Sequence, residues 1–125
     1  MWDAATDETL AQIVGSLFDR GKVVSAVCHG PAGLVRATRR DKRPIVEGRR
    51  VSCFTNTEEE AVGLSQVVPF LLEDRLKELG GLFERGPDWQ PYAVRDGNLI
   101  TGQNPQSSES LAQHVLAALG LAGRI

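Results

Sequence analysis

The hydrophobic residues near the start of the chain recur at helical spacing. Thr6 is a suitable N-cap before them, and Gly21 is suitably placed to end a helix after them. The apolar positions fall on one face of that helix: Leu10, Ile13, Val14, Leu17 and Phe18. The first element is therefore predicted to be an amphipathic helix.

A continuous apolar run, residues 23–27, follows this helix. The run does not alternate, which favours a strand covered on both faces in a parallel sheet. The small residues that follow Cys28 and His29 predict a tight turn and a second helix beginning near Gly30. Helix, strand, turn and helix in this order indicate an α/β fold.

The rest of the chain continues the same alternation. We expect strands over residues 50–54 and 82–84. Residues 92–95 and 99–102 flank Asp96 and Gly97, a strong hairpin signal, and this hairpin is expected at a sheet edge.

Three further helices are predicted after residue 56. Thr57 is expected to cap a short helix through Leu64, with Glu58 and Glu59 favoured in its first turn by the helix dipole. The next helix begins at Pro69 and ends before Gly80 and Gly81, and the last is capped by Ser107 or Ser108 and ends before Gly120.

Composition places the chain among ordinary globular domains. Its 125 residues are 42% hydrophobic and 24% charged, the size of a single domain over residues 1–125. The net charge of −2 gives no broad basic field, so no nucleic-acid partner is expected. Arg39, Arg40, Lys42 and Arg43 form a short basic run that we interpret as a solvated loop.

The sequence also carries no signal for a membrane. No apolar stretch approaches the roughly 20 residues that a spanning helix needs, and the polar start MWDAATDETL lacks the plan of a signal peptide. A cytoplasmic location is expected. Cys28 and Cys53 are too few for a disulfide framework or a zinc-ligand pattern, so we expect reduced thiols, no metal and no other cofactor.

Cys28 carries the chemistry that the sequence suggests. A strand that turns sharply into a helix through a nucleophile is the plan of a nucleophile elbow. The helix N-terminus would favour the thiolate there, and the His29 backbone N–H could stabilise an oxyanion. His29 is a candidate base only if the turn is irregular, and a buried structural cysteine fits the spacing equally well.

Four segments carry a resemblance to a known family: AVCHGPAGL (26–34), GRRVSCFTNTEEEAVGL (48–64), VPFLLEDRLKELGG (68–81) and DGNLITGQNPQSS (96–108). In these the chain resembles the PfpI/ThiJ superfamily of class I glutamine-amidotransferase-like proteins, specifically its glyoxalase III and heat-shock chaperone branch. The resemblance implies a flavodoxin-like parallel sheet with flanking helices and an antiparallel edge hairpin.

The same resemblance implies roles for individual residues. Cys28 would be the catalytic nucleophile and His29 its catalytic partner. His29, Gly30, Thr55 and Asn56 would bind substrate or its oxyanion, with Asn56 able to orient His29. Trp89 either lines the substrate mouth or anchors its loop against the core.

Two further groups of residues are weighed beside these. Asn104 and Thr55 correspond to positions near the cysteine, although each could equally satisfy local backbone groups, and Trp2 and Asp3 are weak pocket candidates. We interpret Cys53 as a buried thiol and His114 as a helical surface residue, so both stay outside the predicted site.

The implied reaction is cofactor-independent chemistry on reactive carbonyls. A cysteine thiolate would convert methylglyoxal to lactate, or act as a protein deglycase on glycated adducts. The alternatives are a holding chaperone, a redox-sensing stress protein, and a cysteine peptidase or amidotransferase-like hydrolase. A homodimer is expected.

Family members carry additional strands, a glutamate near the cysteine and a glycine-rich loop ahead of the matched segments. We therefore expect the N-terminal strands to be missing, so that the chain is an incomplete domain corresponding to about the C-terminal half of a family member. An inactive, truncated product is one of the alternatives.

Overall fold

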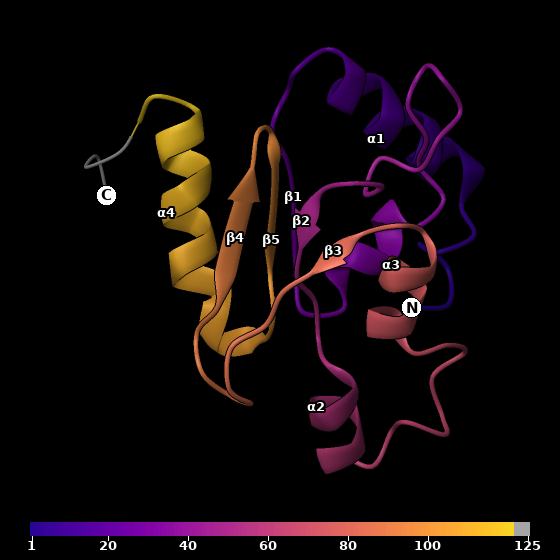
Figure 1. Ribbon diagram of the computed structural model, residues 1–125, viewed down its shortest axis with the longest axis vertical. Helices are drawn as coiled ribbons and strands as arrows, with labels where there is room; N and C mark the ends of the chain where they lie inside the picture. The colour runs from indigo at the N-terminus through magenta and orange to yellow at the C-terminus, as the bar shows by residue number, and fades with distance from the viewer. Residues whose placement is uncertain (122–125) are drawn as a thin grey trace.

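The computed structural model describes residues 1–121 and shows helices on both sides of a central layer of strands (Figure 1). Its elements, in chain order, are α1 (Glu8–Asp19), β1 (Val24–Val27), η1 (Gly30–Leu34), β2 (Arg50–Val51), α2 (Asn56–Ala61), α3 (Leu72–Glu78), β3 (Leu82–Phe83), β4 (Ala93–Asp96), β5 (Leu99–Gly102), η2 (Pro105–Ser107) and α4 (Ser108–Ala118). The predicted α/β alternation is confirmed.

The strands form two small sheets. β1 pairs in parallel with β5, and β4 pairs with β5 in antiparallel fashion, giving the order β1-β5-β4. β2 and β3 form a parallel pair of their own. The Ser52 backbone N–H donates to Thr101 Oγ1 over 2.8 Å and so joins the end of β2 to β5. A mixed sheet with a parallel pair and an antiparallel hairpin agrees with the predicted fold class.

Helices cover this arrangement on both sides. α4 packs against the sheet of β1, β4 and β5, while α1 and α3 lie on the opposite side, beyond β2 and β3 (Figure 1). The core between these layers is made of aliphatic side chains with no exposed surface: Ile45, Val46, Val51, Leu76 and Leu99. Burying each of these side chains contributes about 1.5–3 kcal/mol to folding.

Some predicted boundaries are wrong at helix starts. Asp7, not Thr6, caps α1, and its carboxylate accepts the Leu10 backbone N–H over 2.7 Å. The Thr6 hydroxyl instead donates to backbone carbonyls in the preceding turn. Gly21 follows the helix with φ of +72°, which confirms it as the residue that ends α1.

Other predicted elements are shorter in the structure. The strand expected over residues 50–54 ends at Val51, because the next backbone N–H bonds the Thr101 side chain instead of a ladder partner. The helix expected near Gly30 is the five-residue 3₁₀ helix η1, and the helix expected from Pro69 begins at Leu72. The two-sided burial predicted for β1 holds only in part, because Val24 is buried whereas Ser25 is exposed.

The hairpin lies at the edge of the β1-β5-β4 sheet, as predicted, but its turn is shifted by one residue. Asp96 pairs with Leu99, so the two turn residues are Gly97 and Asn98. β4 is an edge strand, but β5 lies between β4 and β1. The prediction of an edge hairpin is therefore confirmed, and β5, its inner strand, is buried at every position.

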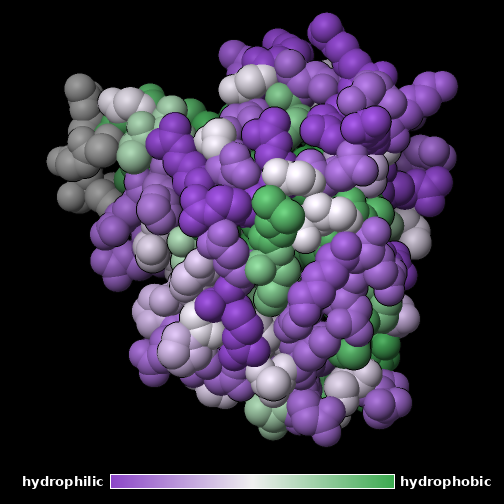
Figure 2. All heavy atoms as spheres, viewed as in Figure 1, coloured by the Kyte–Doolittle hydropathy of each residue, from purple (hydrophilic) through white to green (hydrophobic). Residues whose placement is uncertain are grey.

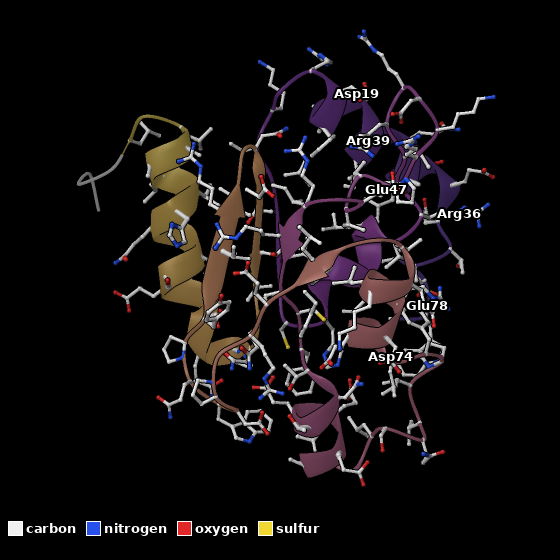
Figure 3. All side chains as sticks on the ribbon, viewed as in Figure 1. Asp19, Arg36, Arg39, Glu47, Asp74 and Glu78 are labelled. Carbon is white, nitrogen blue, oxygen red and sulfur yellow. The ribbon has the colours of Figure 1, made fainter. Side chains whose placement is uncertain are left out.

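The surface shown in Figure 2 is mostly hydrophilic, with a small hydrophobic patch near the centre of that face. The predicted solvated basic loop follows η1, where Arg40, Lys42 and Arg43 are exposed as expected but Arg39 is half-buried. There Arg39 donates to Glu47 over 3.0 Å, and Figure 3 shows these two residues near Arg36 and Asp19. Among residues 1–121, no helix has both the length and the apolar character to cross a membrane.

Candidate active site

Cys28 lies at the carboxyl end of β1 in a strained backbone conformation. Its φ is +63°, a left-handed value that residues other than glycine rarely adopt. The Cys28 backbone N–H donates to Gly102 over 3.0 Å, and its carbonyl accepts from the Phe54 N–H over 2.9 Å. These two bonds hold the strained residue between β5 and the segment that follows β2, as in a nucleophile elbow.

The next residue, His29, connects Cys28 to a carboxylate. Cys28 Sγ lies 3.6 Å from His29 Nδ1, and His29 Nε2 lies 2.6 Å from Glu59 Oε2. Because an ionised carboxylate can only accept, Nε2 carries the proton and Nδ1 is left as an acceptor facing the thiol. The irregular turn that lets adjacent residues face each other is the left-handed conformation of Cys28.

Glu59 is the residue of this site that sequence reasoning missed. Its side chain is only 2% exposed, and its second oxygen, Oε1, has no hydrogen-bond partner among residues 1–121. It does lie in the first turn of α2, but its contact with His29 goes beyond the predicted interaction with the helix dipole. The only available signal was its position in the acidic run after FTNT, and the spacing from His29 does not reveal the contact.

Burial controls the acidity of the Cys28 thiol. Desolvation raises the pKa of Cys28, the His29 backbone N–H lowers it, and the negative charges of Glu58 and Glu59 raise it further, so that the net shift is upward. The predicted stabilisation of the thiolate by a helix N-terminus is therefore wrong. The helix that follows His29 is a single short 3₁₀ segment, and burial and the two carboxylates keep the pKa of the thiol raised.

Glu58, the neighbour of Glu59, is fully buried beside the site and accepts hydrogen bonds from several segments. Its donors are the Thr55 N–H and hydroxyl, the Trp89 N–H, and the side-chain amides of Gln103 and Asn104, at 2.8–3.2 Å. Burial alone would raise the pKa of Glu58, but the hydrogen bonds from Asn104, Trp89 and Thr55 lower it below its ordinary value. Glu58 thus holds together the segments around the candidate site as a buried carboxylate.

Thr55, not Thr57, is the N-cap of α2. Its side chain accepts the Glu58 backbone N–H over 3.1 Å, and the Glu58 side chain accepts the Thr55 N–H in return, forming a capping box. Thr57 is exposed and donates to Asp88. Thr55 is fully buried, and its hydroxyl is already hydrogen-bonded to Glu58 within this cap.

Two other predicted site residues, Gly30 and Asn56, differ in their relation to His29. Gly30 begins η1 directly after His29 and is exposed. Asn56 bonds to α3 instead, since its N–H donates to Glu73 and its side-chain amide donates to Asp74, each over 2.9 Å. Figure 3 labels Asp74 on α3. It is Glu59, and not Asn56, that contacts His29.

Trp89 is separated from His29 by an aromatic ring. The Phe54 ring lies 4.5 Å from the imidazole of His29 and 5.6 Å from the Trp89 ring, measured between centroids. The Trp89 backbone has φ of +62°, and its N–H donates to Glu58. Both contacts anchor the loop around Trp89 against the site.

The residues kept outside the predicted site occupy the expected surroundings. Cys53 is fully buried, its thiol donates to the Phe54 carbonyl over 3.3 Å, and burial raises its pKa well above the ordinary value. His114 is half-buried on α4. Within residues 1–121, no group of three or more His, Cys, Asp and Glu side chains is arranged to hold a metal ion.

A pocket of about 300 Å³ opens beside the histidine and its carboxylate partner. Most of its lining is apolar, and it comprises Met1, Trp2, His29, Glu59, Leu64, Val67 and Val68. Trp2, a weak candidate from the sequence, is thus a pocket residue. The arrangement combines a thiol, a histidine whose Nδ1 faces that thiol, and a space beside the histidine for a small organic molecule. Cys28 is not among the residues that line this space.

A strained cysteine at the end of a parallel strand, next to a histidine and a carboxylate, is typical of α/β proteins with a nucleophile elbow. Residues 3–118 match the DJ-1/PfpI family, and the chain belongs to this family. The resemblance and the flavodoxin-like fold class inferred from the sequence are thereby confirmed.

Several of the relatives that the chain is similar to are named glyoxalases. It is 34% identical to the glutathione-independent glyoxalase HSP31 of Saccharomyces cerevisiae over 95% of this chain and 53% of the relative. The crystal structure of glyoxalase III from Candida albicans matches with a TM-score of 0.87 and 30% identity, over 94% of this chain and 52% of that one. The Rapid Encystment Protein 24 KDa of Francisella tularensis matches with a TM-score of 0.91 and 36% identity, over 94% and 52%. The chain spans about half the length of the curated relatives it matches.

Proposed function

We propose that the chain carries the nucleophile of a cofactor-independent glyoxalase that acts on 2-oxoaldehydes such as methylglyoxal. The observation that carries this proposal is the line of contacts from Cys28 Sγ to His29 Nδ1 and from His29 Nε2 to Glu59. The similarity to proteins named Glyoxalase 3 and glutathione-independent glyoxalase supports the choice of reactive carbonyls as substrates.

The first step forms a bond between the thiol and the aldehyde. Because the pKa of Cys28 is raised, the thiol is mostly protonated at neutral pH, and attack requires that its proton be removed. His29 Nδ1 takes this proton while Sγ bonds to the aldehyde carbon, and Glu59 stabilises the imidazolium that forms. The aldehyde oxygen then receives a proton, giving a hemithioacetal.

The second step is an internal oxidation and reduction. The proton on the former aldehyde carbon is removed and a proton is returned to the neighbouring carbonyl carbon, through an enediol, with His29 as the nearest base. The first carbon becomes a thioester and the second an alcohol. Water then hydrolyses the thioester, releasing lactate and the free thiol, so the reaction consumes one methylglyoxal and one water and needs no external oxidant.

The test follows methylglyoxal consumption and lactate release by the purified chain, its Cys28→Ala variant and its Cys53→Ala variant. We expect Cys28→Ala to abolish turnover, because no nucleophile remains, and Cys53→Ala to retain it if the protein stays folded. Turnover that survives in Cys28→Ala would contradict the proposal.

A holding chaperone is a second candidate, favoured by exposed apolar side chains near the pocket. Trp2, Val62, Leu64 and Val67 are each 41–58% exposed. A chaperone would suppress aggregation of an unfolding client equally well with Cys28 and with Cys28→Ala. Loss of suppression in Cys28→Ala would argue against this candidate.

Homodimer formation and a cytoplasmic location, both expected from the sequence, remain part of the proposal. The place of β1 at the edge of its sheet supports a dimer, because an edge strand offers unpaired backbone groups. Light scattering after gel filtration would give the mass of the assembly, and a monomer at micromolar concentration would contradict the dimer.

A further inference from the structure

Phe54 is a buried aromatic residue that contacts the site through both its backbone and its ring. It lies shortly after β2 and is 4% exposed. Its backbone N–H donates to the carbonyl of the strained residue Cys28 over 2.9 Å. Its ring centroid lies 4.5 Å from that of the His29 imidazole, with 40° between the two ring planes. Phe54 therefore contacts both members of the thiol and imidazole pair.

The Phe54 ring also packs against Trp89. The two ring centroids are 5.6 Å apart, and the planes meet at 65°, an edge-to-face arrangement that aromatic pairs favour. The Trp89 backbone N–H donates to the buried carboxylate of Glu58 over 2.9 Å. Because Trp89 is anchored in this way, the Phe54 ring has a fixed place beside the imidazole.

The hydrogen bond to Glu59 does not by itself set the plane of the His29 ring. It joins one ring atom, Nε2, to Glu59 Oε2 over 2.6 Å, and rotation about the bond from Cβ to a histidine ring is only weakly restricted. The contact at the other nitrogen, Nδ1, is with the Cys28 thiol at 3.6 Å, and a thiol is a weak hydrogen-bond donor. The direction of Nδ1 therefore depends on the ring that packs against the imidazole.

We propose that Phe54 is a positioning residue that holds the plane of the His29 imidazole so that Nδ1 faces the Cys28 thiol. The inference rests on the role of base that the proposed function gives to His29, and it adds a residue outside the line from Cys28 to Glu59. Phe54 transfers no proton, because its side chain has no titratable group. Without the ring, Nδ1 turns away from Sγ in part of the molecules, and removal of the thiol proton slows.

The experiment is a double-mutant cycle on the alkylation of Cys28 by iodoacetamide at pH 7, followed by mass spectrometry of the digested protein. In this reaction Sγ bonds to the acetamide carbon, iodide leaves, and His29 Nδ1 takes the thiol proton. Rates are measured in the purified chain, His29→Ala, Phe54→Leu and the double variant. The cycle separates the coupling of the two side chains from the loss that each substitution causes alone.

We expect His29→Ala to slow the labelling of Cys28 by at least about tenfold in the parent protein, because the base is removed. In the Phe54→Leu background the same substitution should slow labelling by less than about threefold, because the imidazole already faces the thiol in fewer molecules. Equal slowing in both backgrounds would overturn the inference and leave the proposed function standing. No slowing in either background would contradict His29 as the base, and the inference with it.

Phe18→Leu is the matched control for the loss of a buried ring. Phe18 is 6% exposed in α1, and its ring lies against the guanidinium of Arg49. In the Phe18→Leu background, His29→Ala should slow labelling as much as it does in the parent. A reduced effect there as well would show that removing any buried ring disturbs the site, and would overturn the specific role of Phe54.

Two further substitutions at the same position keep the test independent of folding. Phe54→Tyr retains an aromatic ring and should retain the full dependence of labelling on His29, which a substitution that only weakened the core would not restore. If urea titrations show that Phe54→Leu is unfolded, Phe54→Met takes its place in the cycle, because methionine fills irregular space without a ring. Full dependence on His29 in folded Phe54→Met would overturn the inference.

Discussion

At the scale of single residues, Cys28 and Cys53 are distinguished by their surroundings. Cys28 is partly exposed and its pKa is raised, whereas Cys53 is fully buried and its pKa is raised well above the ordinary value. We therefore predict that iodoacetamide alkylates Cys28 before Cys53 at every pH between 6 and 9, as measured by mass spectrometry of the digested protein.

The pH profile of this labelling follows from the direction of the shift. Because the pKa of Cys28 lies above its ordinary value, the thiolate fraction should still be increasing at pH 9. The Cys53→Ala variant is the control for the labelling rate of Cys28. A rate that has already levelled off near pH 6 would show a lowered pKa and contradict the burial argument.

Glu59 is predicted to act as a positioning residue for His29. In Glu59→Gln an amide replaces the carboxylate at 2.6 Å from Nε2, so the imidazole keeps an acceptor but loses the negative charge. We expect methylglyoxal turnover to fall by at least about tenfold, since acid–base catalysis contributes 10²–10⁴-fold.

Nitrogen chemical shifts of His29 distinguish positioning from a structural role. The proton should reside on Nε2 in the parent protein, and Glu59→Ala should populate both tautomers. Glu60→Gln, at an exposed position of α2, is the matched control and should leave the shifts unchanged. Unaltered tautomers in Glu59→Ala would show that Glu59 does not orient the ring.

At the scale of elements, the cap of α2 fixes which glutamates face the site. Thr55→Ala removes the side chain that accepts the Glu58 N–H, and the hydroxyl that donates to Glu58 Oε1 over 2.9 Å. We predict a loss of about 1–2 kcal/mol in the free energy of unfolding, measured with urea. Thr55→Ser retains the hydroxyl and should lose much less, so equal losses in both variants would contradict capping.

The same cap shows how far local sequence patterns can predict structure. Both Thr55 with Glu58 and Thr57 with Glu60 match the capping-box spacing, so the pattern alone does not select the true helix start. The choice depends on contacts from distant segments, such as the Trp89 N–H on Glu58. The order of helices and strands was predictable because it follows hydrophobic periodicity, which is a local property.

The candidate site also has one part that local sequence predicts and another part that depends on contacts between distant segments. The turn at Cys28 and His29 could be inferred because small residues follow a strand directly. Glu59 could not be inferred, because its contact with His29 spans 30 positions and depends on how α2 packs. Asn56 was expected from the family resemblance to orient His29, but its side chain bonds to Asp74 on α3 instead.

At the scale of the whole molecule, Glu58 links α2 to the segments around Trp89 and Asn104. Because its hydrogen bonds favour the ionised form, its pKa is lower in the folded protein than the value of about 4.3 expected when unfolded. The unfolded chain therefore binds this proton at a higher pH than the folded chain does. Glu58 stabilises the fold fully above the unfolded pKa, and this contribution is lost as the pH falls through the folded pKa.

Glu58→Gln tests this linkage. The amide cannot accept all the hydrogen bonds that the carboxylate accepts, so we expect the free energy of unfolding to fall by about 2–3 kcal/mol at pH 7. The difference between parent and variant should then shrink as the pH is lowered from 5 to 3 in urea titrations, because the parent loses the contribution of its carboxylate.

Glu60→Gln is the control, because the carboxylate of Glu60 is exposed and bonds only the nearby Ser65 hydroxyl among the described residues. The free energy of unfolding of this variant should change with pH in parallel with that of the parent. A constant difference between Glu58→Gln and the parent over that range would show that Glu58 titrates alike in both states, and that the buried cluster does not couple the fold to pH.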